Sequence, residues 1–250
     1  MREPARILIV EDDPEWQSAI RQILKADGYA VDTVHTYREA VQAMKARPYQ
    51  LAVIDIRLDA LDPKDLRGMD LLDTVKQIGE EVYSIVVTGY GTVELASYAF
   101  REYGVLDFMD KAFFNPQRFR ALVQKTLASL VYIVLQLNNQ LSMRTMRIKE
   151  ENVLTVSVQP NKPTEGTFGT ILLPETQRYI ETEIAIIAPN AEVMPGSRQY
   201  LKILPNGTSD PVSFKLVPEK RGRIEMIVEV YHRERWLRRL KLDISVLGAR

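Results

Sequence analysis

Apolar and polar positions follow two alternating patterns over the first 125 residues. Short apolar runs alternate with stretches whose apolar residues recur every three or four positions, as in buried strands and amphipathic helices. The runs predict strands at 7–10, 30–34, 51–55, 82–87 and 105–108, and the stretches predict helices at 14–25, 37–45, 69–78, 93–102 and from 116 onward. Five such units with apolar strands predict an α/β fold, a parallel sheet covered by helices on both faces.

Helical spacing continues beyond this region. From residue 127 to residue 141, apolar residues recur at intervals of three and four, which is the spacing of a coiled-coil seam. We therefore expect a long helix over 126–150 that joins two domains. This helix either packs against the second half of the same chain or pairs two copies of the protein through residues 119–141.

Residues 151–250 show the pattern of strands alone. Strands are expected at 153–158, 170–173, 181–187, 199–204, 212–217, 223–231 and 236–246. Turn residues, mainly proline, asparagine and glycine, separate these strands, and the last strand alternates cleanly between apolar and polar positions. Several short strands with regular turn signals predict an antiparallel β-sandwich of immunoglobulin-like size.

The composition limits the class of protein. Hydrophobic residues make up 46% and charged residues 26% of the chain, as in soluble globular proteins. The chain has no cysteine, which excludes disulfide bonds and thiolate metal sites. The apolar runs are far shorter than the ~20 residues that cross a bilayer, and the run at 7–10 is too short for a signal-peptide core. We expect a cytoplasmic protein with no membrane partner.

Polar residues of particular types end the predicted parallel strands. Glu11 and Asp12 follow the first strand, Asp55 ends the third, Thr88 ends the fourth, and Lys111 follows the fifth. Ligand sites of such sheets lie beyond the carboxyl ends of the strands, so these side chains are expected to converge. Clustered carboxylates repel one another unless a cation is present, and all-oxygen ligands suit Mg²⁺.

The chemistry of this group is that of phosphoryl transfer. Asp55 is the candidate nucleophile, because a carboxylate can attack phosphorus to form an acyl phosphate. A metal ion, Lys111 and the Thr88 hydroxyl would stabilise the phosphoryl oxygens. Asp13, which directly precedes Pro14, is better placed to cap the following helix than to bind a metal ion.

Four segments resemble the receiver domain of bacterial response regulators. They are residues 7–13 (ILIVEDD), 53–58 (VIDIRL), 86–91 (VVTGYG) and 107–111 (DFMDK). The resemblance covers residues 5–125 and implies a receiver domain at 1–125 with a flavodoxin-like fold. It also implies that a sensor histidine kinase phosphorylates Asp55.

The resemblance also assigns roles to individual residues. Glu11 and Asp12 would be the acidic pair, with Asp12 a direct Mg²⁺ ligand together with Asp55 and the backbone carbonyl of Arg57. Thr88 and Phe108 would be the switch pair, although Phe108 could equally be a core residue. Arg57 and Tyr90 would gate the access of water, and because both are bulky we expect slow hydrolysis of the phosphoryl group.

Two segments depart from the family pattern. The loop at 59–67 is about five residues longer than usual, and its acidic residues either guard the site, contact a partner or face solvent. Ala112 follows Lys111, where the family usually has a proline, often in a cis peptide. Because a cis bond without proline costs ~3 kcal/mol, we expect a trans peptide at this position.

The second half has no familiar output motif. Its predicted strands leave no place for a helix-turn-helix, and histidine occurs only at positions 35 and 232. Basic residues at 220–223 and at 232–239, around Trp236, could bind a nucleic-acid backbone and stack a base, or could form a solvated rim. Residues 126–250 have 17 basic and 13 acidic residues, a net charge of +4, which is too small to make nucleic acid the leading partner.

The sequence thus predicts a response regulator that relays phosphorylation through a non-enzymatic sandwich to an unknown output protein. The chain's own phosphotransfer and slow dephosphorylation would be its only chemistry. The alternative is a nucleic-acid-binding regulator that uses the basic C-terminal hairpin. A scaffold that is rarely phosphorylated is a third hypothesis, and the complete acidic group counts against it.

Overall fold

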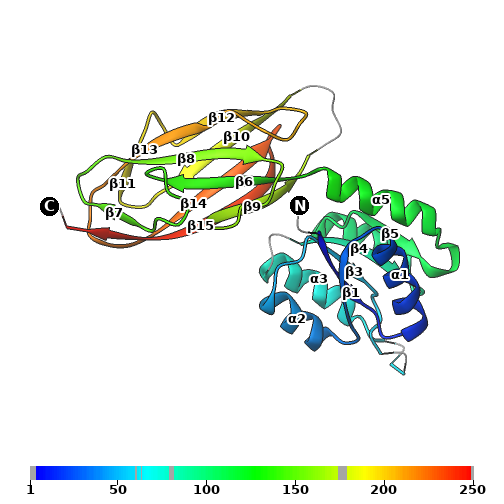
Figure 1. Cartoon of the computed structure of the whole chain (residues 1–250). Coiled ribbons are helices and arrows are strands. Elements are labelled where there is room, and N and C mark those ends of the chain that lie inside the picture. Colours follow the sequence, from blue (N-terminus) through cyan, green and yellow to red (C-terminus); the bar gives the residue numbers. More distant parts are fainter. Residues whose placement is uncertain (1–3, 60, 63, 79–81, 174–178, 249–250) are drawn as a thin grey trace. The chain divides into compact units, whose positions relative to one another are not determined.

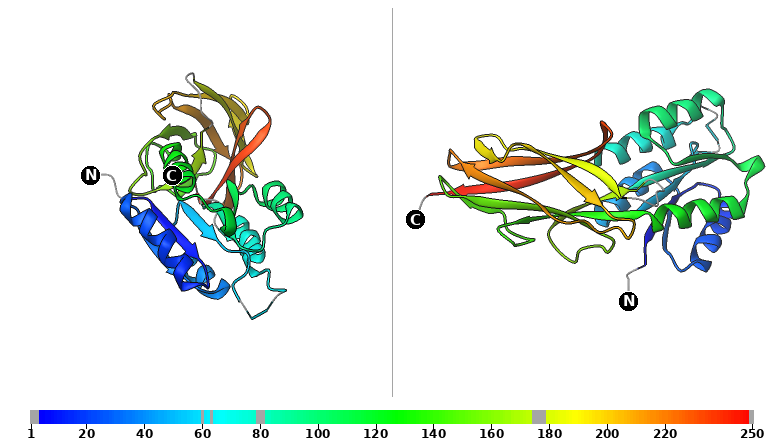
Figure 2. Two further views of the ribbon diagram at one scale, coloured as in Figure 1. Left: turned by 90° about the vertical axis from the view of Figure 1, so that its right-hand side faces the viewer. Right: turned by 90° about the horizontal axis from the view of Figure 1, so that it is seen from above.

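The computed structural model divides the chain into two compact units, between Ala128 and Ser129. It describes residues 4–59, 61–62, 64–78, 82–173 and 179–248. Figure 1 labels the elements of both units, and Figure 2 shows them from two further directions. No helix in these ranges is long and apolar enough to cross a membrane.

The first unit is a five-stranded parallel sheet with the strand order β2-β1-β3-β4-β5. Its strands are β1 (Arg6–Val10), β2 (Ala30–Val34), β3 (Leu51–Ile54), β4 (Tyr83–Thr88) and β5 (Asp107–Asp110). Its helices are α1 (Pro14–Ala26), α2 (Tyr37–Ala46), α3 (Arg67–Ile78), α4 (Val93–Tyr98) and α5 (Pro116–Ala128), with a π-helical turn at Ala99–Tyr103 and a 3-10 turn at Lys111–Phe113. Helices cover both faces of the sheet (Figure 1). The predicted α/β fold is confirmed.

Local sequence explains where these elements begin and end. Strands β1 and β3 are buried along almost their whole length, as expected for strands covered on both faces. The Asp13 carboxylate accepts hydrogen bonds from the amides of Glu15 and Trp16 at the start of α1, which confirms its expected capping role. Strand β5 begins and ends two residues later than predicted, so its last residue is Asp110, directly before Lys111.

The second unit contains two five-stranded sheets, with the orders β12-β10-β14-β15-β7 and β11-β13-β8-β6-β9. Their strands are β6 (Leu130–Leu137), β7 (Thr145–Arg147), β8 (Asn152–Gln159), β9 (Thr167–Leu172), β10 (Ile180–Ile187), β11 (Ala191–Met194), β12 (Arg198–Ile203), β13 (Val212–Pro218), β14 (Gly222–His232) and β15 (Arg235–Leu247). Both sheets contribute to one apolar core, so the unit is the predicted sandwich. Among the described pairings of this unit, β7 and β15 run parallel and the others antiparallel.

The predicted long helix over 126–150 is wrong. Helix α5 ends at Ala128, and β6 begins at Leu130 and lies between β8 and β9. The predicted coiled-coil seam through 119–141 therefore does not form, because residues 130–137 are a strand. A dimer through that seam loses its structural basis. Residues 130–135 are apolar at every position, and such a run fits a central strand as well as a buried helix.

Burial of this segment against the second half of the chain was the correct part of the prediction. The side chains of Val131, Ile133, Leu135 and Leu137 all belong to the sandwich core. The β-branched residues Val131, Ile133 and Val134 favour the extended conformation that the strand adopts.

Candidate functional site

The carboxylates that follow β1 and β3 converge at one edge of the parallel sheet. Glu11, Asp12 and Asp55 each place an oxygen within 4.8 Å of the others. Glu11 and Asp55 are buried, with 1% and 4% of their surfaces exposed, and Asp12 is half-buried. The Asp55 amide donates to the Val10 carbonyl oxygen (2.9 Å), which ties the ends of the two neighbouring strands together.

Lys111, which follows the edge strand β5, contacts two carboxylates of this cluster. Its Nζ atom lies 2.6 Å from Asp55 Oδ2 and 2.7 Å from Glu11 Oε2. Burial lowers the pKa of Lys111, but its hydrogen bonds to Asp55 and Glu11 outweigh this and raise the pKa above the ordinary value. The ammonium group is therefore a permanent positive charge in the site.

One ammonium group does not balance three carboxylates. Burial, together with the Asp55 charge, raises the pKa of Glu11 to about 7, although the hydrogen bond from Lys111 opposes this shift. A raised pKa means that the folded protein disfavours the second buried negative charge. Oxygen ligands with surplus negative charge are the environment that suits Mg²⁺, so the residues present fit this ion.

Thr88 and Phe108 lie on neighbouring strands at the same edge. Thr88 is fully buried at the end of β4, and its hydroxyl accepts a hydrogen bond from the Tyr90 amide (3.2 Å). Phe108 is half-buried in β5. A Cβ atom on Gly91 would lie 2.7 Å from Phe108 Cε1, so the glycine makes room for this ring beside the loop that follows Thr88.

Arg57 and Tyr90, the two residues expected to gate water, contact each other. The Arg57 guanidinium lies 3.6 Å from the centroid of the Tyr90 ring, within the range of a cation–π interaction. Arg57 is 7% exposed and Tyr90 is 54% exposed. The Arg57 amide also donates to Asp55 Oδ1 (3.2 Å), so the same residue contacts the candidate nucleophile and the aromatic ring.

The two departures from the family pattern have clear structures. The peptide bond between Lys111 and Ala112 is trans, as expected. The Asp110 carboxylate accepts a hydrogen bond from the Ala112 amide. In the longer loop, residues 60 and 63 lie outside the described residues. Leu61 is 95% exposed, but Asp65 is only 4% exposed, so the expectation of a solvated loop holds for only part of it.

The family comparison agrees with this geometry. Residues 7–124 match the family described as response regulator receiver domain. Residues 7–124 are a receiver domain. Phosphorylation and Mg²⁺ binding at an acidic pocket are general features of this family. No family matches the C-terminal half.

Relatives of the receiver domain are known from bacteria and archaea. The chain is 32% identical over 124 residues to the nitrogen assimilation regulatory protein NtrX of Azorhizobium caulinodans, a match that covers 50% of this chain and 26% of that protein. It is 33% identical over 108 residues to the C4-dicarboxylate transport transcriptional regulatory protein DctD of Pseudomonas aeruginosa, covering 43% of this chain and 22% of DctD. The chain thus spans about a quarter of the length of these two relatives.

A solved structure is similar to the same region. It is a CheY-like response regulator receiver domain protein from Methanospirillum hungatei JF-1. It is 28% identical in sequence, with a TM-score of 0.44, and the match covers 49% of this chain and 93% of that one.

The basic residues of the second unit do not form one patch. Strand pairing places Gly222 opposite Val246 at one end of the β14–β15 ladder and His232 opposite Arg235 at the other. Arg239, the nearest basic residue of the second segment, pairs with Glu229, six residues from Arg223 of the first. At about 3.3 Å per residue, roughly 20 Å separates the nearest residues of the two basic segments. Arg238 is buried, Arg239 pairs with Glu229, and the Trp236 side chain lies outside the described residues.

Proposed function

We propose that this chain is a cytoplasmic response regulator whose Asp55 accepts a phosphoryl group from a sensor histidine kinase. The observation that carries the proposal is the contact of Lys111 with both Asp55 and Glu11 beside Asp12. This arrangement holds the candidate nucleophile in contact with a fixed cation at the carboxyl edge of the sheet, where ligands bind such folds.

The transfer step follows from these positions. An Asp55 carboxylate oxygen forms a bond to phosphorus while the bond from phosphorus to the kinase histidine nitrogen breaks, and the electron pair stays on that nitrogen. Glu11, Asp12, Asp55 and the Arg57 carbonyl would hold Mg²⁺, which supplies positive charge to the phosphoryl oxygens. The Lys111 ammonium, already 2.6 Å from Asp55, supplies a second positive charge.

Thr88 and Phe108 are proposed as the switch that reports the phosphoryl group. The Thr88 hydroxyl accepts from the Tyr90 amide and retains its own proton as a donor for a phosphoryl oxygen. Movement of Thr88 toward the phosphoryl group would free space beside Phe108, whose half-buried ring could then turn inward. The resemblance to the family supports this role, and so does the proximity of both residues to Gly91.

Arg57 and Tyr90 are proposed to keep the phosphoryl group long-lived. Their stacked side chains, centred 3.6 Å apart, cover the segment next to Asp55 and restrict the approach of water. The chain itself is proposed to have no further enzymatic activity.

Output is proposed to pass through the sandwich to another protein. The alternative is binding of nucleic acid by the basic segments of β14 and β15. The name of the relative DctD, a transcriptional regulatory protein, favours this alternative, whereas the separation of the two basic segments disfavours it. Salt-dependent retention of the chain on a DNA or RNA column, absent on a neutral matrix, would support the alternative.

The test of phosphorylation is size-exclusion chromatography with light scattering, combined with intact-mass measurement. Wild type and Asp55→Asn are compared with and without Mg²⁺ and acetyl phosphate. We expect a mass increase of one phosphoryl group in the wild type alone. An equal mass increase in Asp55→Asn would show that Asp55 is not the acceptor. A change in molecular mass or shape that follows modification would assign the output to self-association.

A further inference from the structure

We propose that Asp65, in the longer loop after β3, is a positioning residue for the metal site, because it fixes the peptide group between Arg57 and Leu58. The inference deepens the proposed function and rests on it, since it concerns the backbone carbonyl proposed to bind Mg²⁺. Asp65 lies in the loop that is about five residues longer than the family pattern, and the resemblance gives it no role.

Asp65 is a buried carboxylate, and its hydrogen bonds to described residues are with Leu58 and with Arg67 of its own loop. Its Oδ2 atom accepts from the Leu58 amide at 2.6 Å. Its Oδ1 atom accepts from the amide (3.2 Å) and the Nε atom (2.7 Å) of Arg67. These hydrogen bonds outweigh the effect of burial and lower the pKa of Asp65, so the group is ionised at neutral pH.

The Leu58 amide and the Arg57 carbonyl belong to one peptide group. A trans peptide is planar, so its C=O and N–H point in opposite directions. The hydrogen bond from Leu58 to Asp65 therefore also sets the direction of the Arg57 carbonyl, which points away from Asp65. A hydrogen bond to a charged acceptor is shorter and stronger than one to a neutral acceptor, so Asp65 restricts rotation of this peptide.

The neighbouring peptide groups are held from other directions. The Gly68 amide donates to the Ile56 carbonyl oxygen (2.9 Å), and the Arg57 amide donates to Asp55 Oδ1 (3.2 Å). A Cβ atom on Gly68 would lie 2.0 Å from the Asp55 carbonyl oxygen, which shows how closely the returning chain approaches this segment. Asp65 supplies a side-chain acceptor for the Leu58 amide, and without it this peptide would lose a charge-assisted hydrogen bond that restrains its orientation.

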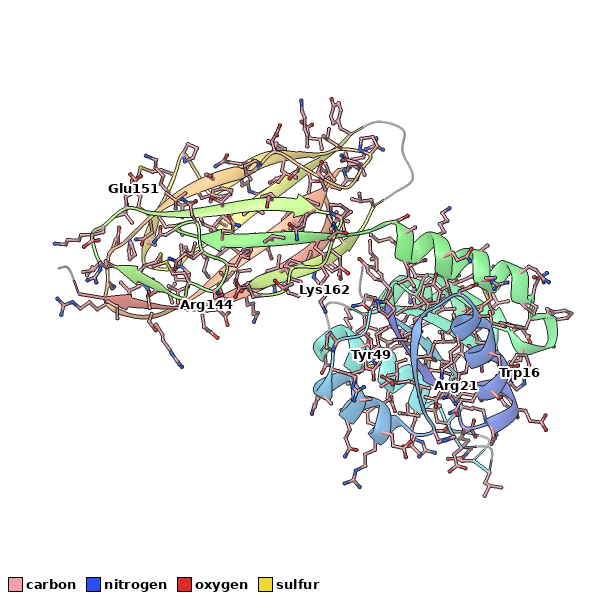
Figure 3. The ribbon with its side chains drawn as sticks, viewed as in Figure 1. Trp16, Arg21, Tyr49, Arg144, Glu151 and Lys162 are labelled. Carbon is pink, nitrogen blue, oxygen red and sulfur yellow. The ribbon has the colours of Figure 1, made fainter. Side chains whose placement is uncertain are left out.

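The test is a Mg²⁺ titration of the full chain carrying Trp236→Phe, which leaves Trp16 as the one tryptophan. Trp16 lies on α1 (Figure 3), and its ring centroid is 5.4 Å from Lys111 Nζ. Its fluorescence should therefore respond when the cluster binds an ion. Isothermal titration calorimetry with Mg²⁺ gives the dissociation constant independently, and urea unfolding in EDTA reports the stability of each variant.

We expect Asp65→Ala to raise the Mg²⁺ dissociation constant about tenfold, the size of effect seen when a group that orients a metal ligand is lost. Asp65→Asn should raise it by about threefold, because a neutral amide oxygen is a weaker acceptor. Two controls should stay within about twofold. Arg67→Gln removes the ion pair and keeps the Leu58 contact, and Asp62→Ala removes an exposed charge of the same loop that contacts the Lys64 amide.

A loss of stability in Asp65→Ala with an unchanged dissociation constant would overturn the inference, because it would show a structural role alone. If Asp65→Ala does not fold, a dissociation constant in Asp65→Asn equal to those of wild type and Arg67→Gln overturns it in the same way. If Asp55→Asn weakens Mg²⁺ binding but the Asp65 variants do not, this inference is refuted and the proposed function still stands. A wild-type chain that does not bind Mg²⁺ would refute both.

Discussion

Either partner of the buried ion pair between Asp55 and Lys111 can be replaced by a neutral residue. We predict that the two replacements have opposite effects on the stability of the metal-free receiver domain. Asp55→Asn removes one of three clustered carboxylates and keeps its shape. Lys111→Met removes the ammonium group that contacts Asp55 and Glu11. Comparing the stabilities of the two variants distinguishes a cluster with surplus negative charge from an ordinary ion pair.

The distances give the size of each effect. At an effective dielectric constant of about 20, the 2.6 Å contact of Asp55 with Lys111 is worth about 6 kcal/mol of attraction. Glu11 and Asp12 lie within 4.8 Å of Asp55, so each repels it by at least about 3.5 kcal/mol under the same assumption when Glu11 is ionised, at a pH above its pKa of about 7. Attraction and repulsion nearly cancel, and the cost of keeping a buried carboxylate out of water remains. We therefore expect Asp55→Asn to raise the free energy of unfolding by about 1–2 kcal/mol without Mg²⁺.

Lys111→Met leaves Glu11 and Asp55 buried without a counter-charge. Breaking a buried pair from one side costs roughly 3–5 kcal/mol. The Lys111 side chain keeps 13% of its surface exposed, so we expect a loss near the lower end, about 3 kcal/mol. Asp62→Asn, in the exposed part of the loop, is the charge-matched control and should change stability by less than about 0.5 kcal/mol.

The assay is urea unfolding of the full chain in EDTA, followed by Trp16 fluorescence in the Trp236→Phe background. Trp16 packs edge-on against Phe114 within the receiver domain (ring centroids 5.4 Å apart), so its signal reports that domain. Adding Mg²⁺ should stabilise the wild type as mass action requires, and should stabilise Asp55→Asn much less. The reasoning is wrong if Asp55→Asn destabilises the metal-free domain as much as Lys111→Met does.

Three further predictions concern separate contacts. Arg57→Ala, which removes the stack on Tyr90, should shorten the lifetime of phosphorylated Asp55 about tenfold or more, about 1.4 kcal/mol in the hydrolysis barrier; a wild-type half-life of seconds would refute the gating role. Thr182→Val should stabilise the sandwich by about 1 kcal/mol in urea unfolding, because the buried Thr182 hydroxyl has no hydrogen-bond partner among the described residues. Tyr231→Phe should cost about 1 kcal/mol at pH 7, because the Tyr231 hydroxyl donates to buried Glu229. That hydrogen bond, with help from Arg239, lowers the pKa of Glu229 below its ordinary value of 4.5, so the stabilisation by the hydrogen bond is fully present above pH 4.5 and is lost as pH falls through the lowered pKa; an equal cost of Tyr231→Phe at pH 7 and pH 3 would refute it.

The acidic site could be predicted from the sequence because the fold class alone brings its residues together. Once the strands are recognised as parallel, residues that end neighbouring strands must meet at one edge. The positions of Glu11, Asp55 and Thr88 could be predicted from this alone. The position of Lys111 could be predicted on the further condition that β5 ends close to it. Strand boundaries were wrong by two residues at β5, and this did not move the site.

Asp65 could not have been found in the same way. It is one of three aspartates in a polar loop, at positions 59, 62 and 65, and no periodicity separates the buried one from the exposed ones. Its direction is fixed by the amide of Leu58, seven residues earlier, a contact that depends on the path of the loop. Contacts of this kind arise from tertiary structure and leave no pattern in the chain.

The segment that was predicted as a linker gives a direct test of the sandwich. A fragment that begins at residue 151, as the predicted domain boundary suggests, would lack β6 and therefore the core side chains of Val131, Ile133, Leu135 and Leu137. Each fully buried side chain of this size contributes about 1.5–3 kcal/mol, so the loss is comparable with the roughly 5–15 kcal/mol that stabilises a whole domain.

The fragment would also leave β8 and β9 without the strand that joins them. We therefore expect residues 151–250 to be unfolded or aggregated, and residues 129–250 to unfold cooperatively with the near-ultraviolet signal of a packed core. A cooperatively folded 151–250 fragment would show that β6 is dispensable and that the order of this sheet is wrong.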